Sequence, residues 1–197
     1  MPTLIVGLIS DTHIPHRLKR LPGAVLDALS GVDLILHAGD VDSPGALGPL
    51  RDVAPVYAVR GNVHVLDLSD GGAMFPPVVE LDLAGQRVVL VHGHRPGLLG
   101  FLLKGLDVAG QLIGLTDNGK TNRRIARRLA RLYPEADVIV FGHTHRAHVE
   151  RVGRPLLVNP GAVCAARGEK PTLARMRLDT EGAHVEIISL LNGVRPG

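Results

Sequence analysis

Ser10-Asp11-Thr12-His13, directly after the apolar run Leu4-Ile5-Val6-Gly7-Leu8-Ile9, is the stretch around which the rest of the chain is interpreted. The length and β-branched content of the run predict a buried strand. Asp11 and His13 follow it two residues apart, a spacing that points both side chains the same way in an extended or turning backbone. Both could therefore bind one metal ion at the carboxyl end of the strand, where α/β sheets place their ligand sites. Because an Asp after a strand is more often a turn former or a helix cap, the pair alone leaves both interpretations open.

Polar side chains follow four further predicted strands in the same way. These strands span 32–37, 55–59, 87–91 and 137–141, and the polar residues after them are Asp40, Asn62 with His64, His92 with His94, and His143 with His145. Because the carboxyl ends of parallel strands meet at one edge of a sheet, we expect these groups to lie close together. Imidazole, carboxylate and carboxamide donors without a thiolate suit Mn, Fe, Zn, Ni or Co better than Ca.

The order of the predicted elements indicates an α/β fold. The first third alternates strands with short helices over 24–29 and 44–50, which is typical of a parallel sheet. The second half is richer in hairpins, with predicted strands over 78–83 and 87–91, 147–152 and 155–158, 172–178 and 184–190. Between the first two hairpins, Thr121 is expected to cap a helix over 122–132 that ends before Pro134.

Length and composition limit the class of protein. With 197 residues, of which 45% are hydrophobic and 3% aromatic, the chain is expected to form a single domain over 1–197 with an aliphatic core. The single cysteine, Cys164, excludes an internal disulfide and agrees with a cytoplasmic location. The longest apolar region, 96–115, is interrupted by Lys104 and Asp107, so no membrane span is expected. The formal net charge of +3 only mildly favours anionic partners.

Taken together, these motifs resemble those of the calcineurin-like metallophosphoesterases, and most of all the small bacterial and archaeal phosphodiesterases. The matching stretches follow the order of the family: Asp11-Thr12-His13, Gly39-Asp40, Gly61-Asn62, His92-Gly93, Gly142-His143-Thr144-His145, and Leu157-Val158-Asn159-Pro160-Gly161. The resemblance implies an α/β (α+β) fold in which two mixed β-sheets pack as a sandwich with flanking helices.

The resemblance also implies two divalent metal ions, with Mn favoured over Fe, Zn, Ni or Co. The first ion would be held by Asp11, His13 and His145, the second by Asn62, His92 and His143, and Asp40 would bridge them. The implied activity is hydrolysis of a phosphodiester by a metal-bridging hydroxide. His94 is expected near the substrate. His64 is interpreted as the proton donor to the leaving group, with an orienting or solvated loop residue as the alternative.

Other functions use the same motifs. A phosphomonoesterase or a nuclease would need the same metal site, and some members of the superfamily are non-catalytic protein-interaction scaffolds. Such scaffolds typically lose part of the ligand set, whereas this chain retains every expected ligand. The sequence therefore favours an enzyme that acts on a small-molecule phosphate ester.

The sequence allows more than one role for two further features. An insertion around 95–134 would form a cap over the metals, a homo-oligomer contact or core padding. Five arginines on the predicted helix, listed as Arg123, Arg124, Arg127, Arg128 and Arg131, would steer phosphate-rich substrates or form a solvated face. The solvated face is preferred, and nucleic acid is a possible but not a favoured partner. Few aromatic residues are available to stack on bases, which counts against a platform for single strands.

Overall fold

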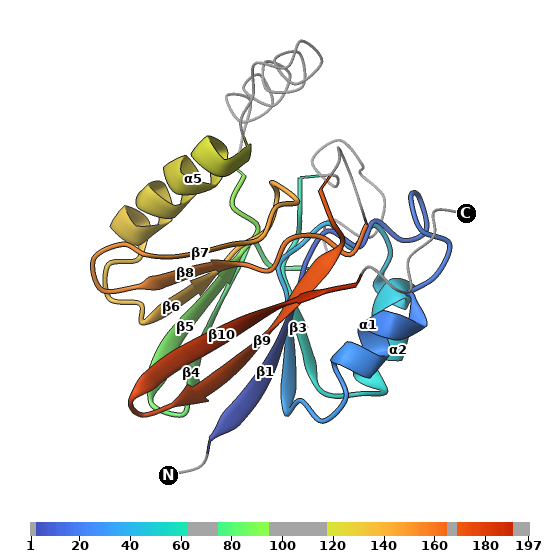
Figure 1. Cartoon of the computed structure of the whole chain (residues 1–197), viewed down its shortest axis with the longest axis horizontal. Coiled ribbons are helices and arrows are strands. Elements are labelled where there is room, and N and C mark those ends of the chain that lie inside the picture. The colour runs from blue at the N-terminus through green and yellow to red at the C-terminus, as the bar shows by residue number, and fades with distance from the viewer. Residues whose placement is uncertain (1–2, 63–74, 95–117, 165–168, 191–197) are drawn as a thin grey trace.

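Two mixed β-sheets pack face to face in the computed structural model, which describes residues 3–62, 75–94, 118–164 and 169–190 (Figure 1). The first sheet has the strand order β10-β9-β1-β2-β3. Its strands are β1 (Leu4–Ile9), β2 (Leu34–His37), β3 (Val56–Ala58), β9 (Thr172–Asp179) and β10 (Gly182–Ser189). β1, β2 and β3 are parallel, and β9 and β10 extend the sheet as an antiparallel pair.

The second sheet has the order β4-β5-β6-β8-β7. It is formed by β4 (Val78–Leu83), β5 (Gln86–Val91), β6 (Val138–Val140), β7 (His148–Arg151) and β8 (Leu156–Asn159). β5, β6 and β8 are parallel, while β4 and β7 pair antiparallel at the two edges. The two hairpins expected over 78–91 and 147–158 are present as β4–β5 and β7–β8. The predicted sandwich of two sheets is confirmed.

The core lies in three layers because the central strands are buried on both faces. Alternate residues of β1 and β2, such as Val6 and Leu36, meet Val88 and Val140 of the second sheet between the sheets. On the outer face of the first sheet, residues such as Ile9 pack against helices α1 (Gly23–Ala28) and α2 (Gly48–Arg51) and the 3-10 helix η1 (Pro44–Leu47). This double burial explains why these strands are continuous apolar runs instead of alternating patterns.

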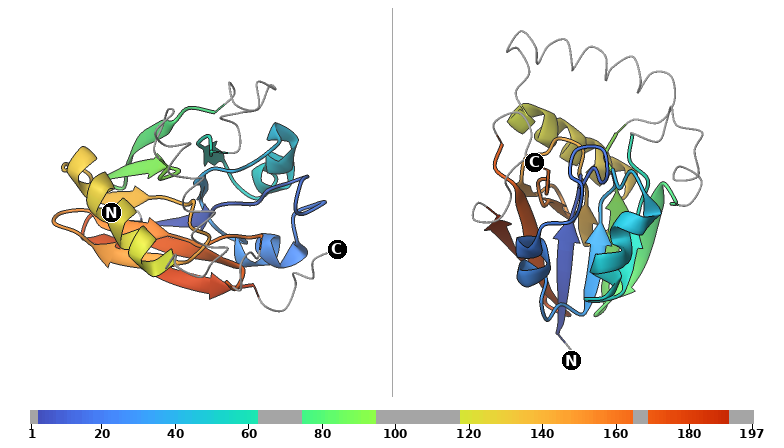
Figure 2. Two further views of the ribbon diagram at one scale, coloured as in Figure 1. Left: turned by 90° about the horizontal axis from the view of Figure 1, so that it is seen from above. Right: turned by 90° about the vertical axis from the view of Figure 1, so that its right-hand side faces the viewer.

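Helix α5 (Asn118–Leu132) covers the outer face of the second sheet through Ile125 and Leu129. It therefore lies on the opposite side of the sandwich from α1 and α2, as Figure 2 shows from above. The predicted end of this helix at Leu132 is confirmed, but the predicted N-cap is wrong. Thr121 lies inside the helix, because Asn118, Gly119 and Lys120 already have helical backbone despite the low helix propensity of glycine.

The insertion expected around 95–134 is described only from residue 118 onward. That part packs as α5 against the second sheet, so it supplies core packing there, and the cap or oligomer contact expected for 95–117 lies outside the described residues. Within the described ranges, no helix is long and apolar enough to cross a membrane.

Candidate metal centre

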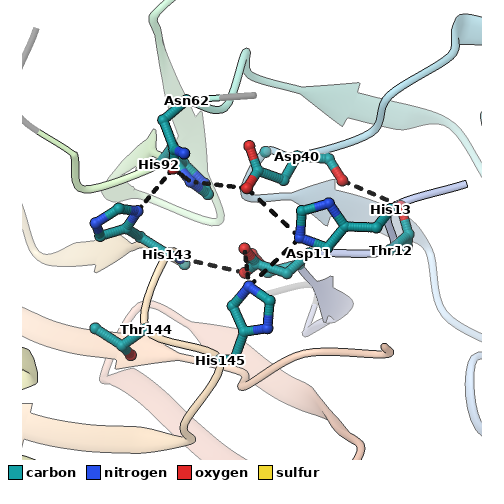
Figure 3. A network of polar contacts seen from close by, with 12 residues as sticks. Asp11, Thr12, His13, Asp40, Asn62, His92, His143, Thr144 and His145 are labelled. Carbon is teal, nitrogen blue, oxygen red and sulfur yellow. Dashed lines mark hydrogen bonds and ion pairs between the residues drawn. The ribbon is translucent and has the colours of Figure 1, made fainter. Parts of the chain in front are cut away.

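The loops that leave the carboxyl ends of β1, β2, β3, β5 and β6 gather at one end of the sandwich, opposite the N-terminus (Figures 1 and 2). Asp11, Asp40 and Asn62 come from the first sheet, whereas His92 and His143 come from the second. The sequence led us to expect one sheet edge, and this is corrected: the polar groups meet because two sheets present their parallel strand ends to each other. Figure 3 shows the resulting cluster.

The first group of donor atoms consists of Asp11, His13, Asp40 and His145, whose ligand atoms all lie within 4.8 Å of one another. His145 Nε2 lies 3.2 Å from Asp11 Oδ1 and 3.4 Å from His13 Nε2. His13 Nε2 lies 3.6 Å from Asp40 Oδ2. Side chains 132 positions apart in the sequence are thus placed around one point.

The second group is centred on Asn62. Its Oδ1 atom lies 2.9 Å from His92 Nε2 and 2.7 Å from His143 Nδ1. Asp40 joins the two groups, because its Oδ2 atom lies 3.5 Å from His92 Nε2 as well as 3.6 Å from His13 Nε2. One carboxylate oxygen therefore stands between two separate sets of donors.

The backbone is bent sharply to aim these side chains. Asp11, His13, Asp40, His143 and His145 all have left-handed φ values, between 49° and 80°, which non-glycine residues seldom adopt. Hydrogen bonds fix the bends, including Asp11 N to Gly39 O at 3.0 Å and His13 N to Asp40 O at 3.1 Å. Such conformations persist only where surrounding contacts determine them, and they concentrate at functional sites.

Burial sets the protonation state of the cluster. Desolvation lowers the pKa of His143 to about 3 and that of His94 to about 4. Burial by itself raises the pKa of Asp11, but the charge and hydrogen bond of His145, together with His92 and Ser10, hold this pKa below its usual range. At neutral pH the His94 and His143 imidazoles are thus neutral and the Asp11 carboxylate is ionised, and these are the forms in which imidazole and carboxylate bind metal ions.

The donor set fits divalent cations. Asp11 Oδ1 and His145 Nδ1 are buried without a hydrogen-bond partner among the described residues. The Nε2 atoms of His13 and His145 face each other at 3.4 Å, and two lone pairs in that position need a proton or a cation between them. Nitrogen and oxygen donors without sulfur agree with Mn, Fe, Zn, Ni or Co.

A carboxylate that the sequence reasoning missed, Asp42, supports the first group. Its side chain is fully buried and lies 3.4 Å from His13 Nδ1 and 2.9 Å from the exposed His16. A carboxylate at Nδ1 of a histidine holds the tautomer whose Nε2 is free to bind a metal. The signal available in the sequence was its spacing of two from Asp40, which places both acids in the same left-handed turn.

A buried amide network supports the loop between His143 and His145. Asn122 of α5 accepts hydrogen bonds from Thr144 Oγ1 at 2.7 Å and from Asn159 Nδ2 at 3.2 Å, and donates to Arg146 O at 3.0 Å. Asn159 Nδ2 also lies 3.0 Å from Gly142 O. The loop is therefore held by both a helix and the end of β8, and no periodic pattern of residues predicts this contact.

Two further histidines, His94 and His37, have different positions relative to the metal centre. The ring of His94 lies 5.5 Å from that of His92 and 6.4 Å from that of His143, next to the second group, and its buried Nδ1 has no partner among the described residues. His37 is fully buried and contacts Thr12 Oγ1 at 3.2 Å, so it lies in the core. His64 lies outside the described residues.

Comparisons with known proteins agree with these observations. The family model described as the calcineurin-like phosphoesterase superfamily domain matches residues 4–181. The chain is 34% identical over 185 residues to a probable metallophosphoesterase of Methanothermobacter thermautotrophicus, a match that covers 94% of this chain and 92% of the relative.

Two solved structures show the same fold. Vacuolar protein sorting 29 from Cryptosporidium parvum has a TM-score of 0.65 at 21% identity, covering 95% of this chain and 97% of that one. A structure described as a novel archaeal phosphodiesterase has a TM-score of 0.62 at 20% identity, covering 94% and 99%.

Proposed function

This chain belongs to the calcineurin-like phosphoesterase superfamily, and from that premise we propose that it is a dinuclear metal-dependent phosphodiesterase. One observation carries the proposal: Asp40 Oδ2 lies within 3.6 Å of both His13 Nε2 and His92 Nε2, between two sets of donors. An arrangement of this kind suits two cations that share one carboxylate.

The proposed ligands follow from the two groups of donor atoms. Asp11, His13 and His145 would hold one ion, and Asn62, His92 and His143 the other, with Asp40 shared. When bound, two divalent cations supply Lewis acidity that polarises phosphoryl oxygens and lowers the pKa of an attacking water. Because only Asp11 and Asp40 carry a carboxylate in this set, a centre with two divalent cations would keep a positive charge that attracts phosphate.

The chain's own residues hold this centre in place. Ser10 Oγ donates a hydrogen bond to Asp11 Oδ2, and the His143 amide donates to the same oxygen at 3.2 Å. His92 Nδ1 lies 2.7 Å from Ala38 O, which directs Nε2 toward Asn62 and Asp40. Asp11 therefore joins the loops of the two sheets, so that the donors of both keep their positions without a bound substrate.

Two histidines are proposed to act on the substrate. His94 is neutral at pH 7, because its pKa is lowered to about 4 by burial, and it stands beside the second group with its Nδ1 unpaired among the described residues. It suits a hydrogen bond to a phosphate oxygen. His64 is proposed to protonate the leaving group, and normal turnover of His64→Gln at every pH would refute that role.

The experiment that tests the function combines metal analysis with turnover. We expect about two Mn ions per chain after loading, and faster hydrolysis of bis(4-nitrophenyl) phosphate than of 4-nitrophenyl phosphate. Faster monoester hydrolysis would identify a phosphomonoesterase with the same centre. Absence of both metal and turnover would support the alternative, a scaffold with the fold that the chain shares with vacuolar protein sorting 29.

A further inference from the structure

Helix α5 carries a concentration of charge that the rest of the chain does not share. Its 15 residues include one lysine and five arginines and no acidic residue. The whole chain has 22 basic and 19 acidic residues, so 16 basic and 19 acidic residues remain elsewhere, a net charge of −3. A positively charged helix thus stands on an otherwise slightly negative protein.

The positive side chains point away from the sheet. Five of them are exposed and form what we call the basic face: Lys120, Arg123, Arg124, Arg127 and Arg131. The opposite side of the helix is buried on the second sheet through Ile125, Ala126 and Leu129. Because this apolar side is already occupied, the helix has no free apolar stripe with which to enter a membrane.

The basic face is not neutralised by neighbouring acids. Among the described residues, none of its members makes an ion pair. Two acidic residues near α5 in the described part of the chain have other partners: Glu135 lies 3.5 Å from Arg154, and Glu150 of β7 lies 3.0 Å from His148. The charge of the face is therefore available to an external anion.

The same helix contacts the metal centre. Arg128 donates hydrogen bonds to the backbone carbonyls of Gly93 and His94, and Asn122 bonds to Thr144 between two proposed ligands. The helix that presents the basic face to solvent thus also contacts the loops that carry His92 and His143. The position of α5 thus connects a surface for anions with a centre for phosphoester chemistry.

We propose that the basic face of α5 binds the phosphate backbone of double-stranded nucleic acid and so brings a phosphodiester to the metal centre. Arg123, Arg127 and Arg131 recur every four residues and span about 12 Å along the helix. That length of duplex carries roughly seven phosphate charges. The chain has no Trp, two Tyr and three Phe, which argues for contacts to phosphates and against base stacking with single strands.

Cleavage of the bound phosphodiester depends on the proposed function, whereas binding of the duplex does not and can be tested separately. Binding of the full chain to a fluorescent 20-base-pair duplex is measured by anisotropy in EDTA at several salt concentrations. The test variant is Arg123→Gln with Arg127→Gln and Arg131→Gln. The control carries the same loss of charge on exposed residues elsewhere: Arg20→Gln, Arg51→Gln and Arg177→Gln.

Each arginine that meets a phosphate contributes about 0.9 to the slope of log K against log salt. The test variant is therefore expected to bind at least about tenfold more weakly, with a slope shallower by about 2.7, while the control keeps the wild-type slope. Hydrolysis of bis(4-nitrophenyl) phosphate with Mn should be equal in all three proteins. If no protein hydrolyses this diester, the proposed function fails although the binding result stands.

Three results would overturn the inference. The first is that the wild-type chain does not bind the duplex at low salt. The second is that the test variant and the control variant lose the same affinity for the duplex. The third is binding to vesicles with 30% phosphatidylserine that depends on the three arginines while duplex binding does not, which would assign the face to a membrane.

Discussion

Replacing Gly61 with alanine should disrupt the shared carboxylate of the centre. A Cβ at this position would lie 2.6 Å from Asp40 Cγ and closer still to Asp40 Oδ1 and the Asp40 backbone nitrogen. Real Cβ contacts are essentially never below 3.0 Å. The backbone at Gly61 does not have a left-handed φ, so alanine is excluded by space alone.

Asp40 cannot move away from the added Cβ without a loss of stability. Asp40 is held in a left-handed turn, and its carbonyl accepts the His13 amide at 3.1 Å. Overpacking of this kind costs about 1–3 kcal/mol of folding free energy. Because the added Cβ clashes with the backbone nitrogen of Asp40 as well as with its side chain, the whole residue has to shift, and a shift of roughly 1 Å misplaces a catalytic group enough to reduce rates about 100-fold.

The assay compares Gly61→Ala with Gly48→Ala, whose added Cβ would meet nothing within 4 Å and whose backbone is helical. We expect Gly61→Ala to lose bound Mn by elemental analysis and most diester turnover, while Gly48→Ala keeps both. Unfolding of each metal-free protein in urea measures the stability cost separately. Two Mn ions with wild-type turnover in Gly61→Ala would refute the role assigned to Asp40.

Four more outcomes are expected. Asp11→Asn should reduce Mn binding to about one ion and remove most turnover with an unchanged circular dichroism spectrum, since it removes one of two anionic donors; full activity would contradict the ligand assignment. Asp42→Asn should weaken Mn affinity about 10- to 100-fold by titration calorimetry, because His13 loses the carboxylate at Nδ1, and His16→Gln is its control. Asn122→Ala should cost about 1–3 kcal/mol in urea unfolding, because buried partners lose their hydrogen bonds; an unchanged midpoint would argue against the network. Burial lowers the pKa of His37 to about 4 from its ordinary 6.5, so the unfolded chain binds more protons between these pH values and the stability of the metal-free protein should fall as pH falls from 6.5 toward 4; His37→Phe should flatten that slope.

Strand positions and donor types were accessible from the sequence because they depend on local patterns. β1 and β5 are apolar runs that end at polar residues, and burial on both faces produces such runs directly. The two-sheet fold followed from the resemblance that these motifs support. Thr121 shows the limit of local reasoning, since a residue type that favours the N-cap lies within a helix that already includes Gly119.

The contacts that support the donors were not accessible. Asp42 reaches His13 across 29 positions, and Asn122 reaches Asn159 across 37. Asn122 belongs to no periodic pattern of polar residues, and the spacing of Asp42 from Asp40 does not by itself distinguish it from a turn former. Only their burial identifies them, because a buried polar side chain needs a partner and that partner is fixed by the fold.

By itself, the sequence determined that Asp11 and His13 stand at the end of a buried strand, with further carboxylate, amide and imidazole groups at later strand ends. The tertiary structure decided that these ends belong to two sheets, that Asp40 stands between two sets of donors, and that the arginines of α5 share one exposed face beside them. The physical reason is that period and turn chemistry act over a few residues. The meeting of Asp11 with His145 depends on how two sheets pack, a property of the whole core.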